Sequence, residues 1–580
     1  MPIVSPRAKM LFAWGVWAAL LVADLVWIAV CGDEVPFWDD WEFVPQITGG
    51  RPVTYAWLWS PHAEHRIVLP RLVYLGAVRI AGGDLRAPLI ANVLLIAAAA
   101  AVLLLAIRRM RGHTAATDAL VPIVFMHPGH AQVFLWGMGL AVSIWAMLGA
   151  VALAIVARGP TCSWRRAIVL ALSLAGLALS GASGLALVPP FVLWLAWAMK
   201  DATRLVKVAI AIPGTLAVLA WLASLLWLDR PAVHPPSPGI LPALGTALEF
   251  LAMSFGQTGR ATWPVSGMVM LVAVAVTVVL LGHALATQPS ERIRTAGLLT
   301  ALGAFVGLAI IVGWGRAGFG PGIALATRYG LLAALAIVCA YVAALQSPRW
   351  APVVQTTLFV LVCASLPYDV AVGIEDGAVW RARGMAVRAD VDAGLSPHEI
   401  ATRHTGVIYP EPTALEQGLA LLRMARLGPY RTATIPGRRY PMFATTPDLV
   451  RSSLAVEPVT VDGEEGLLVH APGEMRIHIA PGTQALALRF GLRPEAYLRG
   501  GRTDGVAFSA DLVIEGGEVP LFFRMLDPFH TPSDRGLQST RLEITTPRGG
   551  DIVLRTMPGP ANELSWDWSV WTAVDVSAGG

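Results

Sequence analysis

The chain has 580 residues, of which 55% are apolar and only 14% are charged, with a mean hydropathy of +0.61. An apolar excess of this size over such a length excludes an ordinary soluble globular protein and indicates a polytopic membrane protein. The formal net charge of +4 is small, and the basic residues cluster between apolar runs. That distribution is typical of membrane orientation and excludes nucleic acid as a partner. The four cysteines lie far apart, so neither a disulfide framework nor a thiolate metal site is predicted.

The first apolar run follows a short basic N-terminus, and its length of about twenty residues predicts an uncleaved first span. Nearly all later runs end before residue 368, so residues 1–367 are predicted to form an α-helical membrane domain of about 11 spans. Some runs are shorter than the roughly 20 residues that cross a bilayer, and "HPGH" (127–130) and "SGASG" (180–184) are expected to break them. The candidate spans are 11–30, 88–107, 117–127, 132–157, 167–181, 185–200, 207–228, 263–285, 297–313, 329–346 and 351–367.

Lysine and arginine predict the orientation of these spans. If the N-terminus is cytoplasmic, every cytoplasmic segment is basic, as the positive-inside rule requires. The odd number of spans then places the C-terminal 213 residues and the loop 31–87 outside the cytoplasmic membrane. The basic residues used are Arg7, Lys9, Arg108, Arg109, Arg111, Arg158, Arg165, Arg166, Lys200, Arg204, Lys207, Arg292, Arg294 and Arg349.

The loop 31–87 concentrates charge in two short stretches, "FWDDWEF" (37–43) and "PHAEHR" (61–66). A carboxylate at an apolar boundary loses hydration and becomes a better base. Aromatic side chains interleaved with acids are typical of a binding pocket lined by aromatic rings. The alternative is a set of solvated loop acids. The candidate residues are Asp39, Asp40 and Glu42 with Trp38 and Trp41, and His62, Glu64, His65 and Arg66 in the second stretch.

The second stretch continues into "IVLPRLVYLGAVRIAGG" (67–83), which is predicted to lie in the membrane interface with its arginines reaching toward headgroups. Arg66 and Arg71 are interpreted as anion contacts, because arginine suits phosphate. The spacing of the histidines and acids fits no familiar metal site, so no metal or other cofactor is predicted.

Two further places hold charge beside apolar runs. In "GWGRAGFGPGIALATRYG" (313–330), Arg316 and Arg328 with Tyr329 either contact an anion or snorkel toward the interface. His127 and His130 flank a Pro-Gly break. They either line the pocket or only form hydrogen bonds at helix ends. External carboxylates, external arginines and a large external domain together suit a lipid-like, phosphorylated substrate.

"WDDWEFVP", "HAEHRIVLPRL", "WGMGL" (136–140), "SGASGLALVPP" and "GRAGFG…ATRYG" resemble bacterial polytopic membrane glycosyltransferases of the GT-C superfamily, over roughly residues 10–370. The resemblance implies transfer of a sugar from a polyprenyl-phosphate donor to a glycan or lipid acceptor outside the membrane, with inversion. It implies Asp39 as the base, with Asp40 as a neighbour that could substitute for it. Arg66, Arg316 and Arg328, with Tyr329, would then bind the donor phosphate.

Residues 368–449 are predicted to form a mixed helical and linker layer, which includes "PTALEQGLALLRMARLGPY" (412–430). Residues 450–580 alternate in a period of two between Gly, Pro and Asp turns, which predicts an antiparallel, jelly-roll-like β-sandwich of about eight strands. It resembles carbohydrate-binding modules, which implies that it positions a glycan acceptor. Trp566, Trp568 and Trp571 are core or rim residues, or else sugar platforms.

A transporter or flippase of a lipid-linked saccharide is the main alternative function. It would explain the spans and the arginines, but it needs no external carboxylates, and transporters place ionisable groups near the midplane. An anchoring scaffold is a weaker alternative, because one span would suffice.

Overall fold

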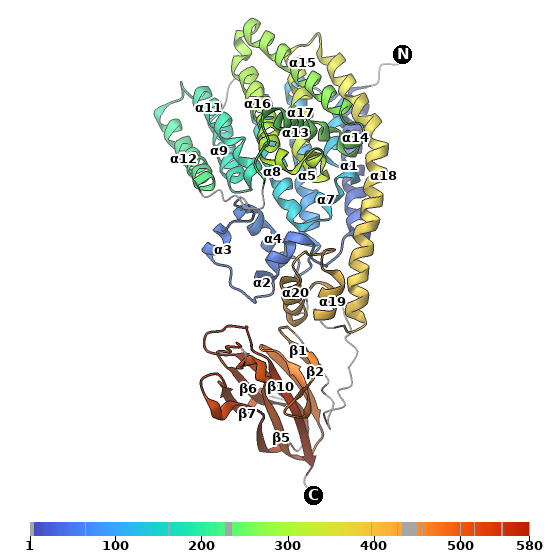
Figure 1. The fold of residues 1–580 in the computed structure, drawn as a ribbon. Helices are drawn as coiled ribbons and strands as arrows, with labels where there is room; N and C mark the ends of the chain where they lie inside the picture. Colours follow the sequence, from blue (N-terminus) through green and yellow to red (C-terminus); the bar gives the residue numbers. More distant parts are fainter. Residues whose placement is uncertain are drawn as a thin grey trace. The chain divides into compact units, whose positions relative to one another are not determined.

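The computed structural model describes residues 5–63, 65–159, 163–226, 235–395, 397–425, 427–431, 443, 447, 449–454, 456–498, 500–514, 517–546 and 549–578. Contacts divide the chain into two compact units. The helical unit comprises Met1–Asp33 and Val53–Ala382, and the sandwich unit comprises Glu34–Pro52 and Arg383–Gly580. Each unit is described by itself (Figure 1).

The helical unit consists of α-helices joined by short 3₁₀ turns. The α-helices are α1 (Pro6–Cys31), α3 (Tyr55–Trp59), α4 (Val68–Ile80), α5 (Ala87–Arg111), α6 (Leu120–Phe125), α7 (Ala131–Phe134), α8 (Leu140–Ala157), α9 (Trp164–Ala178), α10 (Ala182–Leu185), α11 (Val188–Ala198), α12 (Arg204–Leu226), α13 (Ile240–Ala252), α14 (Gly256–Ala261), α15 (Val265–Thr287), α16 (Arg292–Arg316), α17 (Gly330–Ala343) and α18 (Ala351–Asp392). The 3₁₀ turns are η2 (Ala116–Ala119), η3 (Pro128–His130), η4 (Gly137–Gly139), η5 (Met253–Phe255), η6 (Pro289–Glu291), η7 (Ala317–Phe319), η8 (Ile323–Leu325), η9 (Thr327–Tyr329) and η10 (Ala344–Gln346).

Among the described residues, nine helical segments are long and apolar enough to cross a membrane. Eleven spans were predicted, and the segments at 117–127, 167–181 and 185–200 form helices too short to be counted among these nine. The nine also include a segment that the sequence analysis missed, Ile240–Ala261, which has a mean hydropathy of only 1.2. The helical N-terminal part is therefore that of a multi-pass membrane protein.

The two predicted breaks are present. The chain leaves the helical conformation between α6 and α7 at "HPGH", and between α9 and α11 at "SGASG". Gly181 adopts a φ of +117° there, a left-handed conformation that side-chain-bearing residues rarely reach. Non-helical backbone inside such a bundle is tolerated where it is buried, as it is here.

The centre of the helical unit is α17, since 94% of the span that contains it is buried. It packs against α8 and α16, while α5 packs along α8.

A buried polar cluster also lies inside this unit. Arg111 Nη1 lies 2.7 Å from both carboxylate oxygens of Asp118, and the Tyr341 hydroxyl donates to the same carboxylate. Ionic groups are tolerated inside the bundle when they are paired in this way.

The sandwich unit begins with helices and ends with ten strands. The helices and turns are η1 (Trp38–Phe43), α2 (Val44–Ile47), α19 (Pro397–His404), α20 (Pro412–Ala425), η11 (Gly428–Tyr430), η12 (Pro494–Ala496) and η13 (Pro532–Asp534). The strands are β1 (Leu449–Ser452), β2 (Val456–Val461), β3 (Glu464–Val469), β4 (Gly473–Ile479), β5 (Thr483–Leu492), β6 (Val506–Ile514), β7 (Gly517–Leu526), β8 (Gln538–Thr546), β9 (Gly550–Pro558) and β10 (Ser569–Ala578).

The strands form two five-stranded antiparallel sheets, in the orders β1-β4-β9-β6-β7 and β2-β3-β10-β5-β8. The predicted sandwich is confirmed, but ten strands replace the expected eight. Phe490, Phe508 and Trp571 fill the core between the sheets, and Trp571 is fully buried. Trp568 is partly buried against this core, whereas Trp566 is 37% exposed.

Candidate functional site

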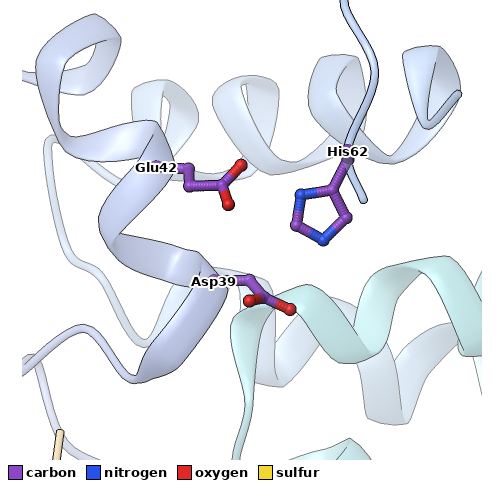
Figure 2. A group of neighbouring side chains, drawn as sticks. All are labelled: Asp39, Glu42 and His62. Carbon is purple, nitrogen blue, oxygen red and sulfur yellow. The ribbon is translucent and has the colours of Figure 1, made fainter. Parts of the chain in front are cut away.

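The acidic segment belongs to the sandwich unit, where it forms the 3₁₀ helix η1. Asp39 and Glu42 lie one turn apart, and a carboxylate oxygen of Asp39 lies within 4.8 Å of one of Glu42. Figure 2 shows both carboxylates projecting from the same side of η1. Asp39 is half-buried and Glu42 is exposed. This pair can act as a base with a supporting acid, or offer two oxygen ligands to a divalent cation.

Asp40 has a different role from its neighbour. Its side chain is only 5% exposed, and its Oδ2 accepts a hydrogen bond of 3.4 Å from the backbone N–H of Phe37. A carboxylate in this position caps the start of the helix. The geometry therefore argues against Asp40 as a substitute base. Of the two adjacent aspartates, Asp39 is the accessible one.

The aromatic residues of the segment divide in the same way. Trp41 is 4% exposed and packs on α20, where a Cβ atom at Gly418 would lie only 2.7 Å from its ring. Trp38 is 43% exposed and has a φ of 47°, which is strained for a bulky side chain. Its backbone is held by a 2.7 Å hydrogen bond from its N–H to Ile408 O. Trp41 is thus an anchor, and Trp38 is the aromatic side chain presented beside Asp39.

Tyr409 is a neighbour of the acid pair that sequence reasoning missed. Burial raises the pKa of its hydroxyl, and the charges of Glu42, Asp39 and Glu411 raise it further. These charges place the phenol close to Asp39 and Glu42, where it remains a neutral hydrogen-bond donor. A single tyrosine in "GVIYPEP" carries no sequence signal for such a role.

The histidine–arginine stretch belongs to the helical unit. His62 and His65 exchange backbone hydrogen bonds of 2.8 and 3.1 Å across a tight turn in which Ala63 has a φ of 49°. His62 and Arg66 are buried, and His65 packs on Gly181, where a Cβ atom would lie 3.3 Å from the imidazole Cδ2. The "PHAEHR" and "SGASG" motifs therefore meet, whereas Glu64 lies outside the described residues.

The predicted headgroup contact of Arg71 is wrong. Arg71 is 3% exposed, and its Nη1 donates to the backbone carbonyls of Trp57 and Ser60 at 2.7 and 2.8 Å and of Leu58 at 3.1 Å. Its guanidinium also lies over the Trp57 ring. Arg71 therefore holds the chain that leads into the histidine turn, and Arg79 is the arginine of α4 that stays exposed.

His127 and His130 are both buried, with ring centroids 4.2 Å apart. His130 Nε2 lies 2.9 Å from Val124 O, and its ring packs on Gly330 at the start of α17. The "HPGH" break thus meets the "ATRYG" motif. His127 also lines a small internal cavity with Asp369 of α18, which sequence reasoning missed. Asp369 Oδ1 accepts hydrogen bonds from Thr258 N at 2.7 Å and Thr258 Oγ1 at 3.2 Å.

The glycine-rich loop 317–329 is held at two points. Glu249 of α13, only 4% exposed, accepts hydrogen bonds from the backbone N–H groups of Gly322 and Ala324 at 2.7 and 3.3 Å. Gln132 of α7 accepts from Thr327 Oγ1 at 2.6 Å and Arg328 N at 3.2 Å. Sequence reasoning missed both residues, because an isolated Glu or Gln in an apolar run has no motif around it.

The arginines flanking this loop are half-buried rather than extended into solvent. Arg328 lies over the Tyr329 ring at 5.3 Å, and Arg316 lies over the Phe319 ring at 5.8 Å. Tyr329 is itself buried against Phe250, with ring centroids 5.7 Å apart. In the described part of the chain, no carboxylate forms an ion pair with Arg328. Its charge therefore remains available for an anion.

The structure thus brings Asp39 together with Glu42, His65 with the "SGASG" turn, and His130 with the start of α17. The acidic segment and the histidine–arginine stretch belong to different units, so their meeting in one pocket stays a prediction.

No family model matches the chain. An uncharacterized protein from Archaeoglobus fulgidus is 34% identical over 70 residues, and the match covers 12% of this chain and 18% of the relative.

Proposed function

We propose that the protein is an inverting membrane glycosyltransferase. It moves a sugar from a polyprenyl-phosphate donor to a cell-envelope glycan or lipid acceptor at the extracytoplasmic face of the bacterial inner membrane. The observation that carries this proposal is the placement of Asp39, half-buried beside Glu42 on a helix that Asp40 caps and Trp41 anchors. A general base must be reachable by the acceptor and still be held in one position.

In the proposed reaction, Asp39 takes the proton of the acceptor hydroxyl, whose oxygen attacks the anomeric carbon of the donor sugar. The bond from that carbon to the phosphate oxygen breaks, and the lipid phosphate leaves with the electron pair. Arg66, Arg316 and Arg328 are assigned to the phosphate, because guanidinium groups match phosphate oxygens and offset developing negative charge.

Two features of the helical unit support the assignment of Arg328. Gln132 accepts from the backbone N–H of Arg328 itself, and Glu249 fixes the loop that precedes it, so the guanidinium is presented from a held loop. Preorganised donors stabilise a transition state without reorganisation at the moment of reaction. Replacing Arg328 by Ala should therefore raise the KM for donor more than the KM for acceptor.

The sandwich is assigned to the acceptor glycan. Trp566 is exposed and its ring lies 5.2 Å from that of Trp568, which in turn lies under the guanidinium of Arg493. Exposed aromatic faces suit sugar rings. Trp566 is the best candidate platform, whereas Trp571 is a core residue.

One observation favours the alternative of a transporter or flippase. His127 and Asp369 are buried ionisable groups that line one cavity inside the helical unit. Transporters place such groups near the membrane midplane. Under this alternative, the lipid-linked saccharide would move across the membrane without transfer of its sugar.

The decisive experiment uses purified full-length protein with a polyprenyl-phosphate sugar and a glycan acceptor. Asp39→Asn keeps the shape of the side chain and removes the base, so transfer should fall about 10²–10⁴-fold with the protein still monodisperse. Glu465→Gln, an exposed acid on β3, is the matched control and should retain parental activity.

Full activity of Asp39→Asn would contradict the assignment of the base. If the parent transfers no sugar but moves the lipid across proteoliposomes, and Asp369→Asn abolishes that movement, the transporter alternative is correct instead.

A further inference from the structure

Three arginines gather at one end of three packed helices in the helical unit. Arg109 lies in the last turn of α5, Arg158 follows the end of α8, and Arg166 lies in the first turn of α9. Helix α8 packs against both α5 and α9, and this packing brings the three helix ends together. These residues are remote in sequence from the motifs discussed above and have no role in the proposed function.

The charges of Arg109 and Arg166 act on Arg158. Burial lowers the pKa of Arg158 below its ordinary value, and the charges of Arg109 and Arg166 lower it further. Across the described ranges, none of the three forms an ion pair with a carboxylate. Arg111, two residues beyond Arg109, shows the contrast because it is paired with Asp118 at 2.7 Å. The cluster therefore carries unbalanced positive charge that an anion would stabilise.

Two details separate this cluster from an ordinary basic helix end. The Nε–H of Arg158 is buried and has no hydrogen-bond partner among the described residues, which is costly for a cationic donor. Arg166 lies at the start of α9, where the helix dipole disfavours a positive charge. The helix dipole therefore favours Arg109 and Arg158 but not Arg166, whose Nε donates to Ser163 Oγ at 3.1 Å, and one shared anion would offset the charge of all three.

The position of the cluster identifies the source of the anion. Helices α5 and α8 belong to membrane-span candidates that end at Arg111 and Ala157, so the arginines lie at the limit of the apolar segments. Trp164, 48% exposed at the start of α9, is a residue typical of the membrane–water interface. This is the depth of lipid phosphates, and arginine is the side chain best suited to bind them.

We propose that Arg109, Arg158 and Arg166 form a binding site for the phosphate headgroup of an anionic phospholipid. The site lies between the ends of α5, α8 and α9. It would retain such a lipid at this end of the helical unit, whatever reaction the protein performs.

The test uses full-length protein in mixed micelles containing phosphatidylglycerol or phosphatidylcholine, with bound lipid counted by native mass spectrometry. The parent should retain phosphatidylglycerol in preference to phosphatidylcholine. Arg158→Gln and Arg166→Gln should each weaken that retention about five- to tenfold, because each removes one guanidinium contact near the lipid phosphate. Arg108→Gln and Arg165→Gln are matched controls, since they remove the exposed arginines that precede Arg109 and Arg166 in the chain.

Equal retention of phosphatidylglycerol by the parent and by both test variants would overturn the proposal. Equal loss in the two control variants would also overturn it, because a diffuse basic surface would then explain the binding.

Binding of inorganic phosphate is the third measurement. If phosphate binds the parent in an Arg158-dependent manner while phosphatidylglycerol is retained no better than phosphatidylcholine, the site takes a soluble anion. Arg166 is half-buried, so Arg166→Gln keeps the test valid if Arg158→Gln fails to fold.

Discussion

Asp567 makes the stability of the β-sandwich depend on pH. The residue is fully buried before β10, where Thr503 Oγ1 donates to its Oδ1 at 3.0 Å. Its Oδ2 is buried without a partner among the described residues. Burial raises the pKa of Asp567 from 3.8 to about 8, so the folded protein holds a proton that the unfolded chain releases. Its contribution to stability is therefore full below pH 3.8 and is lost as the pH rises toward 8.

His470 has the opposite effect on how stability depends on pH. Burial lowers the pKa of His470 from 6.5 to about 4, so the unfolded chain binds the extra proton between these values and stability rises with pH there. Each group changes the free energy of unfolding by about 1.4 kcal/mol per pH unit, so the two nearly cancel at lower pH. From pH 6.5 to 8, Asp567 is the one of these two groups that still titrates, and it should lower the stability of the sandwich by about 2 kcal/mol.

Asp567→Asn should abolish this loss, because asparagine stays neutral while keeping an oxygen for Thr503. The variant should also show the rise of about 3 kcal/mol between pH 4 and 6.5 that His470 alone produces. The measurement is hydrogen exchange of the β10 and β5 amides in the full-length protein, corrected for intrinsic rates and converted to a free energy of opening. Asp575→Asn, on an exposed position of β10, is the control.

Two results would refute this reasoning. One is a parental opening free energy that stays level or rises between pH 6.5 and 8. The other is a decline over that interval in Asp567→Asn that is as large as in the parent.

Three further outcomes are expected. Arg111→Met leaves a fully buried carboxylate without its cation and should lower the stability of the detergent-solubilised protein by about 3–5 kcal/mol, measured by thermal or denaturant unfolding. Trp571→Ala should destabilise the sandwich by about 3–5 kcal/mol, whereas Trp566→Ala, at an exposed site, should cost under about 1 kcal/mol in the same exchange measurement. In intact spheroplasts, a cysteine at exposed Arg502 should react with a membrane-impermeant reagent and one at exposed Ser290 should not; the reverse pattern would invert the proposed orientation.

The apolar runs predicted most of the long helices because backbone hydrogen bonds in a bilayer must be satisfied within each segment. The missed span shows the limit of this rule. Ile240–Ala261 contains Glu249, Ser254 and Gln257, which lower its hydropathy. These residues are nevertheless buried, since Glu249 bonds the backbone of the glycine-rich loop and Gln257 donates to Gly129 O. Such partners come from distant parts of the chain.

The sandwich shows a similar division. The alternation over residues 450–580 predicted about eight strands, whereas the structure has ten, and the local signal is weak in β1 and β2. Strand β2 contains Pro458, which is unfavourable in a strand by local rules, and β1 has only four residues. Strand β1 pairs with β4, and strand β2 pairs with β3. Strand pairing is non-local, so short segments give a weak local signal.

The composition and periodicity of the sequence determined a multi-pass helical part, a β-sandwich and a charged segment containing Asp39, because these depend on the hydrophobicity of neighbouring residues. Tertiary structure alone separated Asp39 from Asp40, by turning one side chain outward and the other into a helix cap. It also decided that Arg71 bonds backbone carbonyls, and it brought Tyr409 and Gln132 to their partners. A side chain's partners depend on where distant segments lie, and hydrophobic periodicity carries no information about that.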